Sequence, residues 1–133
     1  MSNISKVLIV DDDPRMCDSL KALLSNNGCI FQTSNTGKEA IGLMDKNFFD
    51  LVLLDLFIAD TNGFQIMDYI NSQSPDTFVI VITGNSSEKS AIDTIRKGAY
   101  DYIKKPFEPE KLIKTVENVL NHFSDNASPG QCQ

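Results

Sequence analysis

The chain contains three short runs of consecutive apolar residues: Val7–Val10, Leu51–Leu54 and Phe78–Ile82. A run without polar alternation is typical of a strand covered on both faces, as in a parallel sheet between helices. Two further segments, 30–34 and 100–103, mix apolar and polar residues, which indicates strands at the sheet edges. The pattern therefore predicts five strands, three central and two outer.

Between and after these strands, apolar residues recur at the three- and four-residue spacing of amphipathic helices. Helix-capping residues precede three of these stretches: Asp13 with Pro14, Thr36 with Glu39, and Ser86 or Ser87. The last stretch, from Pro109, has the clearest apolar stripe. The fourth has only a thin one, formed by Ala91, Ile92 and Ile95.

Five strands alternating with five helices predict an α/β domain with a parallel sheet and right-handed crossovers. The order 2-1-3-4-5 places the apolar strands centrally and the mixed strands at the edges. This is the flavodoxin-like (βα)5 three-layer sandwich. We expect the domain to occupy residues 1–123. The polar segment 124–133 reads as a disordered tail or the start of a linker.

Composition narrows the function classes. The chain has 133 residues, 41% of them hydrophobic, which fits one soluble domain, and its net charge of −6 argues against nucleic acid binding by this domain. No apolar run approaches the ~20 residues that span a bilayer, so we expect no membrane association. Three scattered cysteines, Cys17, Cys29 and Cys132, have no metal-ligand spacing and fit a reducing cytoplasm.

Carboxylates stand where two of the predicted central strands end: Asp11 and Asp12 after the first, Asp55 after the third. The predicted strand order makes these strands neighbours, so the carboxylates should converge at one crevice. Clustered carboxylates repel one another unless one holds a proton or a cation lies among them. Hard oxygen ligands with open positions suit Mg²⁺.

Two further residues stand at the ends of predicted strands, at the same edge of the sheet, which we call the rim. Thr83 follows the fourth strand with a hydroxyl donor, and Lys105 follows the fifth with a mobile ammonium suited to phosphate. Aspartate is an established phosphoryl acceptor, and phosphoryl transfer requires mainly positioning and charge neutralisation. The rim therefore has the parts of a phosphoryl-transfer site.

These residues resemble the receiver domain of two-component response regulators. The matching stretches are VLIVDDDP, DLVLLDL with Gly63 eight residues after Asp55, VIVITG and GAYDYIKKPF, and together they extend over roughly residues 5–123. The resemblance implies a phosphoacceptor switch rather than an enzyme. Asp55 would take a phosphoryl group from a histidine kinase or a phosphotransfer protein.

The resemblance also implies a Mg²⁺ site. Asp12, Asp55 and the backbone carbonyl of Phe57 would bind the ion, and Asp11 would complete the acidic pocket partly through water. The family commonly has Met-Pro three and four residues after the acceptor, where this chain has Ile58-Ala59. We hypothesise that the bulky Phe57 side chain shields the acyl phosphate from water.

A switch is implied as well. Thr83 and Lys105 would each contact a phosphoryl oxygen, and Tyr102 matches the aromatic position that turns inward when Thr83 moves. The Lys105–Pro106 peptide is expected to be cis. The surface of the fourth helix, fifth strand and fifth helix would change, and an output partner or a second copy in a homodimer would bind there.

Three other functions remain open on the residues alone. An FMN carrier of this fold would need a phosphate loop rich in Ser, Thr and Gly after the first strand, where this chain is acidic. A phosphatase of the haloacid dehalogenase type would need a second Asp where Phe57 stands. A receiver that works by contact alone is disfavoured by the complete set of rim residues, although Ile58-Ala59 leaves room for it.

Overall fold

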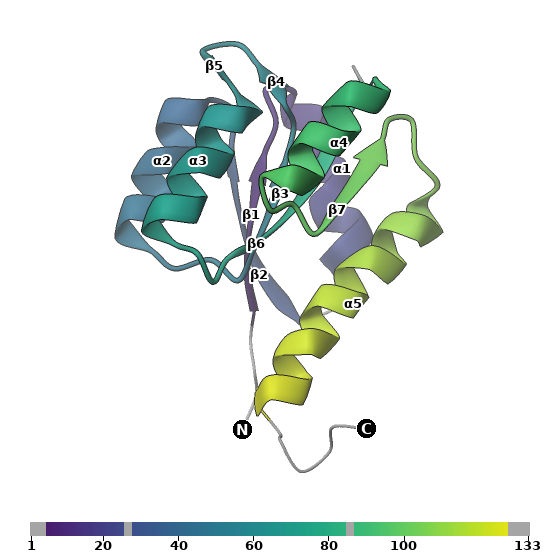
Figure 1. Cartoon of the computed structure of the whole chain (residues 1–133). Coiled ribbons are helices and arrows are strands. Elements are labelled where there is room, and N and C mark those ends of the chain that lie inside the picture. Colours follow the sequence, from purple (N-terminus) through teal and green to yellow (C-terminus); the bar gives the residue numbers. More distant parts are fainter. Residues whose placement is uncertain (1–4, 26–27, 85–86, 128–133) are drawn as a thin grey trace.

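A five-stranded parallel sheet with helices on both faces forms the centre of the domain (Figure 1). The computed structural model describes residues 5–25, 28–84 and 87–127. The sheet strands are β1 (Ser5–Val10), β2 (Cys29–Ser34), β3 (Leu51–Leu54), β6 (Phe78–Thr83) and β7 (Asp101–Lys104). The helices are α1 (Pro14–Leu24), α2 (Gly37–Lys46), α3 (Gly63–Gln73), α4 (Glu88–Arg96) and α5 (Pro109–Ala127).

The sheet order is β2-β1-β3-β6-β7, and all neighbouring pairs are parallel. Numbered along the chain, these five strands have the predicted order 2-1-3-4-5, so the flavodoxin-like sandwich is confirmed. In the register of the sheet, Val10 lies beside Leu54, and Leu54 lies beside Val81. The ends of the three central strands therefore reach the same edge of the sheet.

The central strands are apolar throughout because each of their faces packs against helices. Leu8 and Val10 belong to a core cluster with residues of α2 and α3, whereas Val7 and Ile9 belong to a second cluster with residues of α1 and α5. Alternate side chains of one strand thus enter different cores. No polar alternation is left to mark the strand in the sequence.

Predicted caps begin three of the helices. Asp13, Thr36 and Ser87 each accept a hydrogen bond from a backbone N–H in the first turn of α1, α2 and α4. The cap of α3, Asn62, was not predicted. It ends a second, two-stranded sheet in which β4 (Phe57–Ile58) pairs with β5 (Thr61–Asn62) in antiparallel fashion. Strands of two residues are too short to show a period in the sequence.

Helix α4 buries a threonine side chain where the other helices bury apolar ones. Its Thr94 is fully buried, whereas Ile92 and Ile95 are 46% and 48% exposed. Its far end is tied to α3, because the Lys97 ammonium lies 2.9 Å from a carboxylate oxygen of Asp68. The thin apolar stripe of the sequence therefore faces outward and does not enter the core.

Helix α5 continues to Ala127, so residues 124–127 of the predicted tail are helical, and 128–133 lie outside the described residues. The expectations for Ser86 and Cys132 also fall outside them. In the described part of the chain, no helix is long and apolar enough to cross a membrane.

Candidate functional site

Asp11 and Asp55 lie side by side at the carboxyl edge of the sheet. Each continues the sheet hydrogen bonding by one residue: the Asp55 N–H donates to the Val10 carbonyl at 3.0 Å, and the Asp11 N–H donates to the Ser34 carbonyl at 3.1 Å. Both residues are nearly buried, with exposed fractions of 3% for Asp11 and 8% for Asp55. Buried carboxylates require compensating partners.

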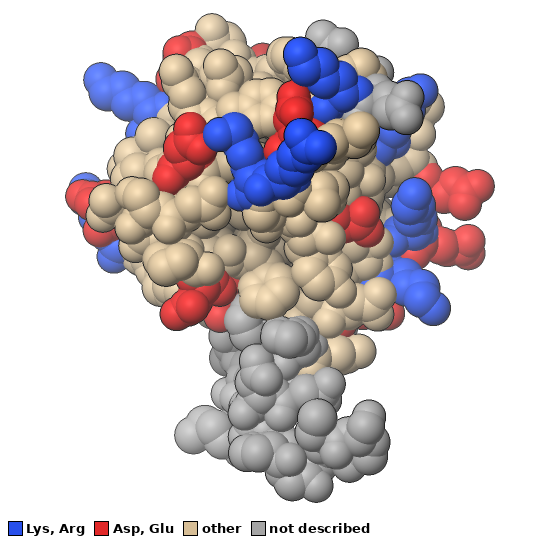
Figure 2. Space-filling view, in the orientation of Figure 1, with Lys and Arg blue, Asp and Glu red and all other residues tan. Residues whose placement is uncertain are grey.

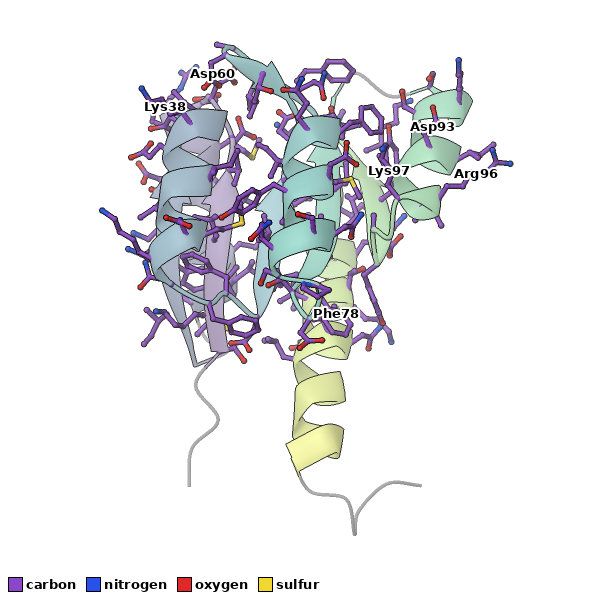
Figure 3. The ribbon with its side chains drawn as sticks, turned by 60° about the vertical axis from the view of Figure 1, so that its left-hand side comes forward. Lys38, Asp60, Phe78, Asp93, Arg96 and Lys97 are labelled. Carbon is purple, nitrogen blue, oxygen red and sulfur yellow. The ribbon has the colours of Figure 1, made fainter. Side chains whose placement is uncertain are left out.

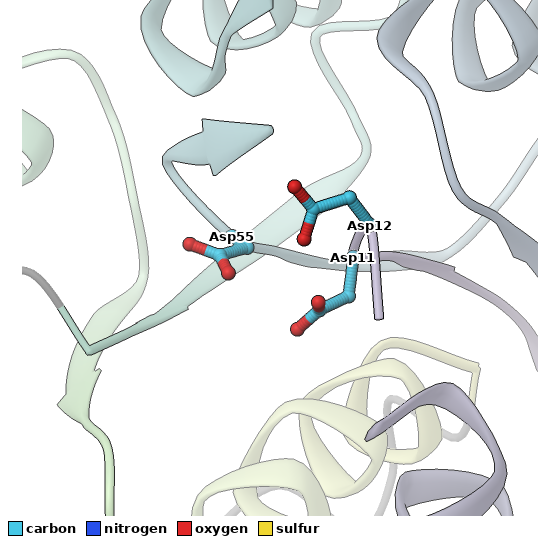
Figure 4. A group of neighbouring side chains, drawn as sticks. All are labelled: Asp11, Asp12 and Asp55. Atoms are coloured by element: carbon cyan, nitrogen blue, oxygen red, sulfur yellow. The ribbon is translucent and has the colours of Figure 1, made fainter. Parts of the chain in front are cut away.

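Asp12 joins these two residues from the same loop. One carboxylate oxygen from each of Asp11, Asp12 and Asp55 lies within 4.8 Å of the others (Figure 4). Asp12 is exposed, so the cluster opens toward solvent on its side. All three groups offer oxygen atoms; those of Asp11 and Asp55 are buried and that of Asp12 is accessible. Such a set suits a hard divalent ion such as Mg²⁺, which retains several waters. The three residues would hold it.

Lys105 supplies the positive charge within this cluster. Its ammonium donates to Asp11 Oδ2 at 2.7 Å and to Asp55 Oδ2 at 3.0 Å. Burial alone would lower the pKa of Lys105, but the two hydrogen bonds and the charges of Asp11 and Asp55 raise it overall. The side chain therefore stays protonated and bridges the two carboxylates.

The second oxygen of each buried carboxylate binds the backbone. Asp11 Oδ1 accepts from the Asp13 N–H at 2.9 Å, and Asp55 Oδ1 accepts from the Phe57 N–H at 3.1 Å. Each carboxylate thus has one oxygen on Lys105 and one on a backbone amide. This arrangement fixes the orientation of both groups before any ligand arrives.

Two residues that the sequence reasoning missed hold the Asp11 backbone. The Asn35 side-chain amide donates to the Asp11 carbonyl at 2.8 Å, and the Cys17 thiol lies 3.6 Å from the same oxygen. Burial, followed by the charges of Asp11 and Asp18, raises the pKa of Cys17 to about 11. Asn35 directly follows β2, so the strand-end argument used for Asp11 could have found it.

Thr83 and Lys105 are linked through the backbone, because the Lys105 N–H donates to the Thr83 carbonyl at 2.9 Å. Thr83 itself is fully buried. The Lys105–Pro106 peptide is cis, as expected. Tyr102 packs against the core cluster under α2 and α3, and its hydroxyl oxygen is inaccessible to solvent. The ring therefore lies inward.

The segment after Asp55 passes close to the start of α3. The Gly63 N–H donates to the Leu56 carbonyl at 2.7 Å, and a Cβ at Gly63 would lie only 2.8 Å from Leu56 Cα. No larger residue fits there without displacing the backbone beside Asp55. Ile58 is 7% exposed and belongs to the core, whereas the Phe57 side chain is 45% exposed.

A family model described as the response regulator receiver domain matches residues 7–117. The chain is 34% identical over 116 residues to the transcriptional regulatory protein ZraR of Escherichia coli K12, a match that spans 87% of this chain and 26% of ZraR. It is 33% identical over 120 residues to the response regulator SaeR of Staphylococcus aureus USA300, across 90% of this chain and 52% of SaeR. The chain thus spans about a quarter to a half of these relatives.

Solved structures agree with the family match. A CheY-like response regulator receiver domain protein from Methanospirillum hungatei superposes with a TM-score of 0.86 at 27% identity, covering 93% of this chain and 99% of that one. The receiver domain of DrrB, a Thermotoga maritima protein, in a BeF3-activated form superposes with a TM-score of 0.81 at 32% identity, covering 90% and 99%.

Proposed function

The chain belongs to the response regulator receiver domain family, and we propose that Asp55 is its phosphoryl acceptor in a Mg²⁺-dependent reaction. One observation carries the proposal. Asp55 is a nearly buried carboxylate with two acidic neighbours within 4.8 Å and an ammonium at 3.0 Å. A nucleophile, a metal-binding set and a phosphate-binding cation thus occupy one place.

In the proposed reaction, a carboxylate oxygen of Asp55 forms a new P–O bond. The P–N bond to a histidine of the donor breaks at the same time, and the histidine nitrogen takes up a proton. The donor would be a histidine kinase or a phosphotransfer protein. Asp11, Asp12, Asp55 and the Phe57 carbonyl would hold a Mg²⁺ ion, which would neutralise the charge of the phosphoryl group.

Lys105 has two tasks in this proposal. Before phosphorylation its ammonium offsets the charge of Asp11 and Asp55. Afterwards the same ammonium binds a phosphoryl oxygen, which replaces part of its contact with the carboxylates. The buried Thr83 hydroxyl binds another phosphoryl oxygen. A backbone hydrogen bond joins Lys105 to Thr83, and in this proposal it couples their movements.

We further propose that these movements alter the surface of α4, β7 and α5. Support comes from α4, whose exposed Ile92 and Ile95 line a shallow groove with Ala91 and Arg96. Lys and Arg side chains gather in the upper part of this face, where α4 lies (Figure 2). An output domain, a separate protein or a second copy would bind there. We place this action in the cytoplasm, where the histidine kinases of such systems act.

The test is to incubate the protein with acetyl phosphate and then to measure the mass of the intact chain. The proposal predicts one phosphoryl group per chain with Mg²⁺ present, little without it, and none on Asp55→Asn. An adduct that persists on Asp55→Asn would refute the assignment of Asp55. No adduct from acetyl phosphate or phosphoramidate would favour a receiver that acts by contact alone.

A further inference from the structure

Asp60 connects the segment after the phosphoacceptor with a helix that is distant in the sequence. Its Oδ1 accepts the Gly37 N–H at 2.8 Å, and its Oδ2 accepts the Lys38 N–H at 3.0 Å. These are the first two residues of α2. Figure 3 shows Asp60 beside Lys38 at one end of α2.

The contact completes the N-terminus of α2. The first N–H groups of a helix have no partner within the helix. Thr36 Oγ1 accepts only the third, from Glu39, at 3.0 Å. Asp60 takes the first two, and its negative charge also lies at the favourable end of the helix dipole. Hydrogen bonds from Gly37 and Lys38 lower the pKa of Asp60, so the carboxylate stays ionised at neutral pH.

Shape reinforces this contact. A Cβ at Gly37 would collide with the Thr61 methyl group, so β5 lies directly against the first turn of α2. The Thr61 hydroxyl in turn donates to the side-chain oxygen of Gln65 in α3. On the other strand of the hairpin, Ile58 is buried in the core. The β4–β5 hairpin is thus held between α2, α3 and the core.

The same hairpin carries Phe57. Its N–H orients Asp55 at 3.1 Å, and its carbonyl is a proposed metal ligand. The hydrogen bond from the Gly63 N–H to the Leu56 carbonyl closes the base of the hairpin. Beyond this base the hairpin is held by its pairing, in which Phe57 lies opposite Asn62, and by three side-chain contacts. These are the burial of Ile58, the bond from Thr61 to Gln65 and the bonds that Asp60 accepts from α2.

We propose that Asp60 is a positioning residue for the Mg²⁺-binding site: by capping α2 from the hairpin, it holds the Phe57 backbone at the place where Asp55 and the ion need it. This inference rests on the proposed function. It assigns to a side chain outside the acidic cluster a part in metal affinity. Groups that hydrogen-bond a metal ligand directly typically change metal affinity by about 10- to 100-fold when removed. Asp60 acts one step further from the ion, so we expect the lower end of that range.

Two variants separate positioning from helix capping in general. Asp60→Ala removes both hydrogen bonds between α2 and the hairpin and leaves the packing of Thr61 against Gly37. Thr36→Ala removes a cap from the same end of the same helix but leaves the hairpin contact in place. Calorimetric Mg²⁺ titration should show about tenfold weaker binding for Asp60→Ala and unchanged binding for Thr36→Ala. Asp60→Asn, which keeps an acceptor oxygen, should lie between Asp60→Ala and the wild type.

Phosphorylation by acetyl phosphate gives a second measurement. For Asp60→Ala, the Mg²⁺ concentration at half-maximal rate should rise, and saturating Mg²⁺ should restore most of the rate. Equal Mg²⁺ affinity in Asp60→Ala and wild type, or equal weakening in Asp60→Ala and Thr36→Ala, would overturn the inference while leaving Asp55 as acceptor. A wild-type chain that binds no Mg²⁺ and takes no phosphoryl group would overturn both.

Discussion

Lys105→Met removes the cation that the two buried carboxylates share. Asp11 and Asp55 are almost fully buried, and each gives one oxygen to the Lys105 ammonium at 2.7 and 3.0 Å. Removing one partner of a buried ion pair costs 3–5 kcal/mol, because the remaining charge is uncompensated. The Lys105 side chain is 18% exposed, which favours the lower end, about 3 kcal/mol of unfolding free energy.

Mg²⁺ should offset this loss. An ion that binds only the folded state adds about 2.7 kcal/mol at a concentration one hundred times its dissociation constant. At the proposed site, the ion would compete with the ammonium for Asp11 and Asp55 in the wild type but not in Lys105→Met. We therefore expect saturating Mg²⁺ to stabilise Lys105→Met more than the wild type.

The assay is urea unfolding at neutral pH, followed by circular dichroism, with and without Mg²⁺. Lys104→Met is the matched control, because it changes the net charge equally and removes an exposed side chain at the adjacent position. Equal stability of the Lys105→Met and Lys104→Met variants would refute the bridging role. Equal stabilisation of all three chains by Mg²⁺ would refute the competition between the ion and the ammonium.

Three further predictions concern single residues around the site. Gly63→Ala should destabilise the fold by about 1–3 kcal/mol, measured by urea unfolding, because the new Cβ would lie 2.8 Å from Leu56 Cα; an unchanged stability would contradict the close approach. Burial raises the pKa of Cys17 from 9.0 to about 11, so the thiolate forms at lower pH in the unfolded chain than in the folded one. As pH rises from 9 toward 11, the unfolding free energy of the wild type should therefore fall by about 2 kcal/mol relative to that of Cys17→Ala. Parallel curves of stability against pH for the two chains would count against this. Phe57→Asn should hydrolyse its acyl phosphate several-fold faster in a phosphate-release assay, and a rate no faster than wild type would exclude shielding.

The features that could be predicted from the sequence are those set by residues close together in the chain. The all-apolar run before Asp55 predicts a strand covered on both faces, and such strands must be central. From this placement follows the meeting of Asp11 and Asp55, because the ends of neighbouring parallel strands share an edge. The cap at Thr36 was equally visible, since capping depends on residues close together in the chain.

Contacts between distant residues left no comparable signal. Asp60 is 23 residues from Gly37, and an isolated aspartate in a polar loop looks the same whether or not it caps a helix elsewhere. The β4–β5 hairpin is too short for a period of two to appear. The apolar stripe of α4 does not by itself say whether it faces the core or a partner. The expectation of a partner surface on this helix came from the thinness of the stripe and from the family resemblance, and the exposure of Ile92 agrees with it.

Locating the phosphoryl group by chemistry tests the assignment of Asp55 as acceptor. After incubation with acetyl phosphate and Mg²⁺, borohydride reduces an aspartyl phosphate to homoserine, and peptide mass spectrometry identifies the position. We predict homoserine at position 55 alone, with little of it in samples that lacked Mg²⁺. Homoserine at position 11 or 12, or equal amounts with and without Mg²⁺, would contradict a metal-dependent acceptor at Asp55.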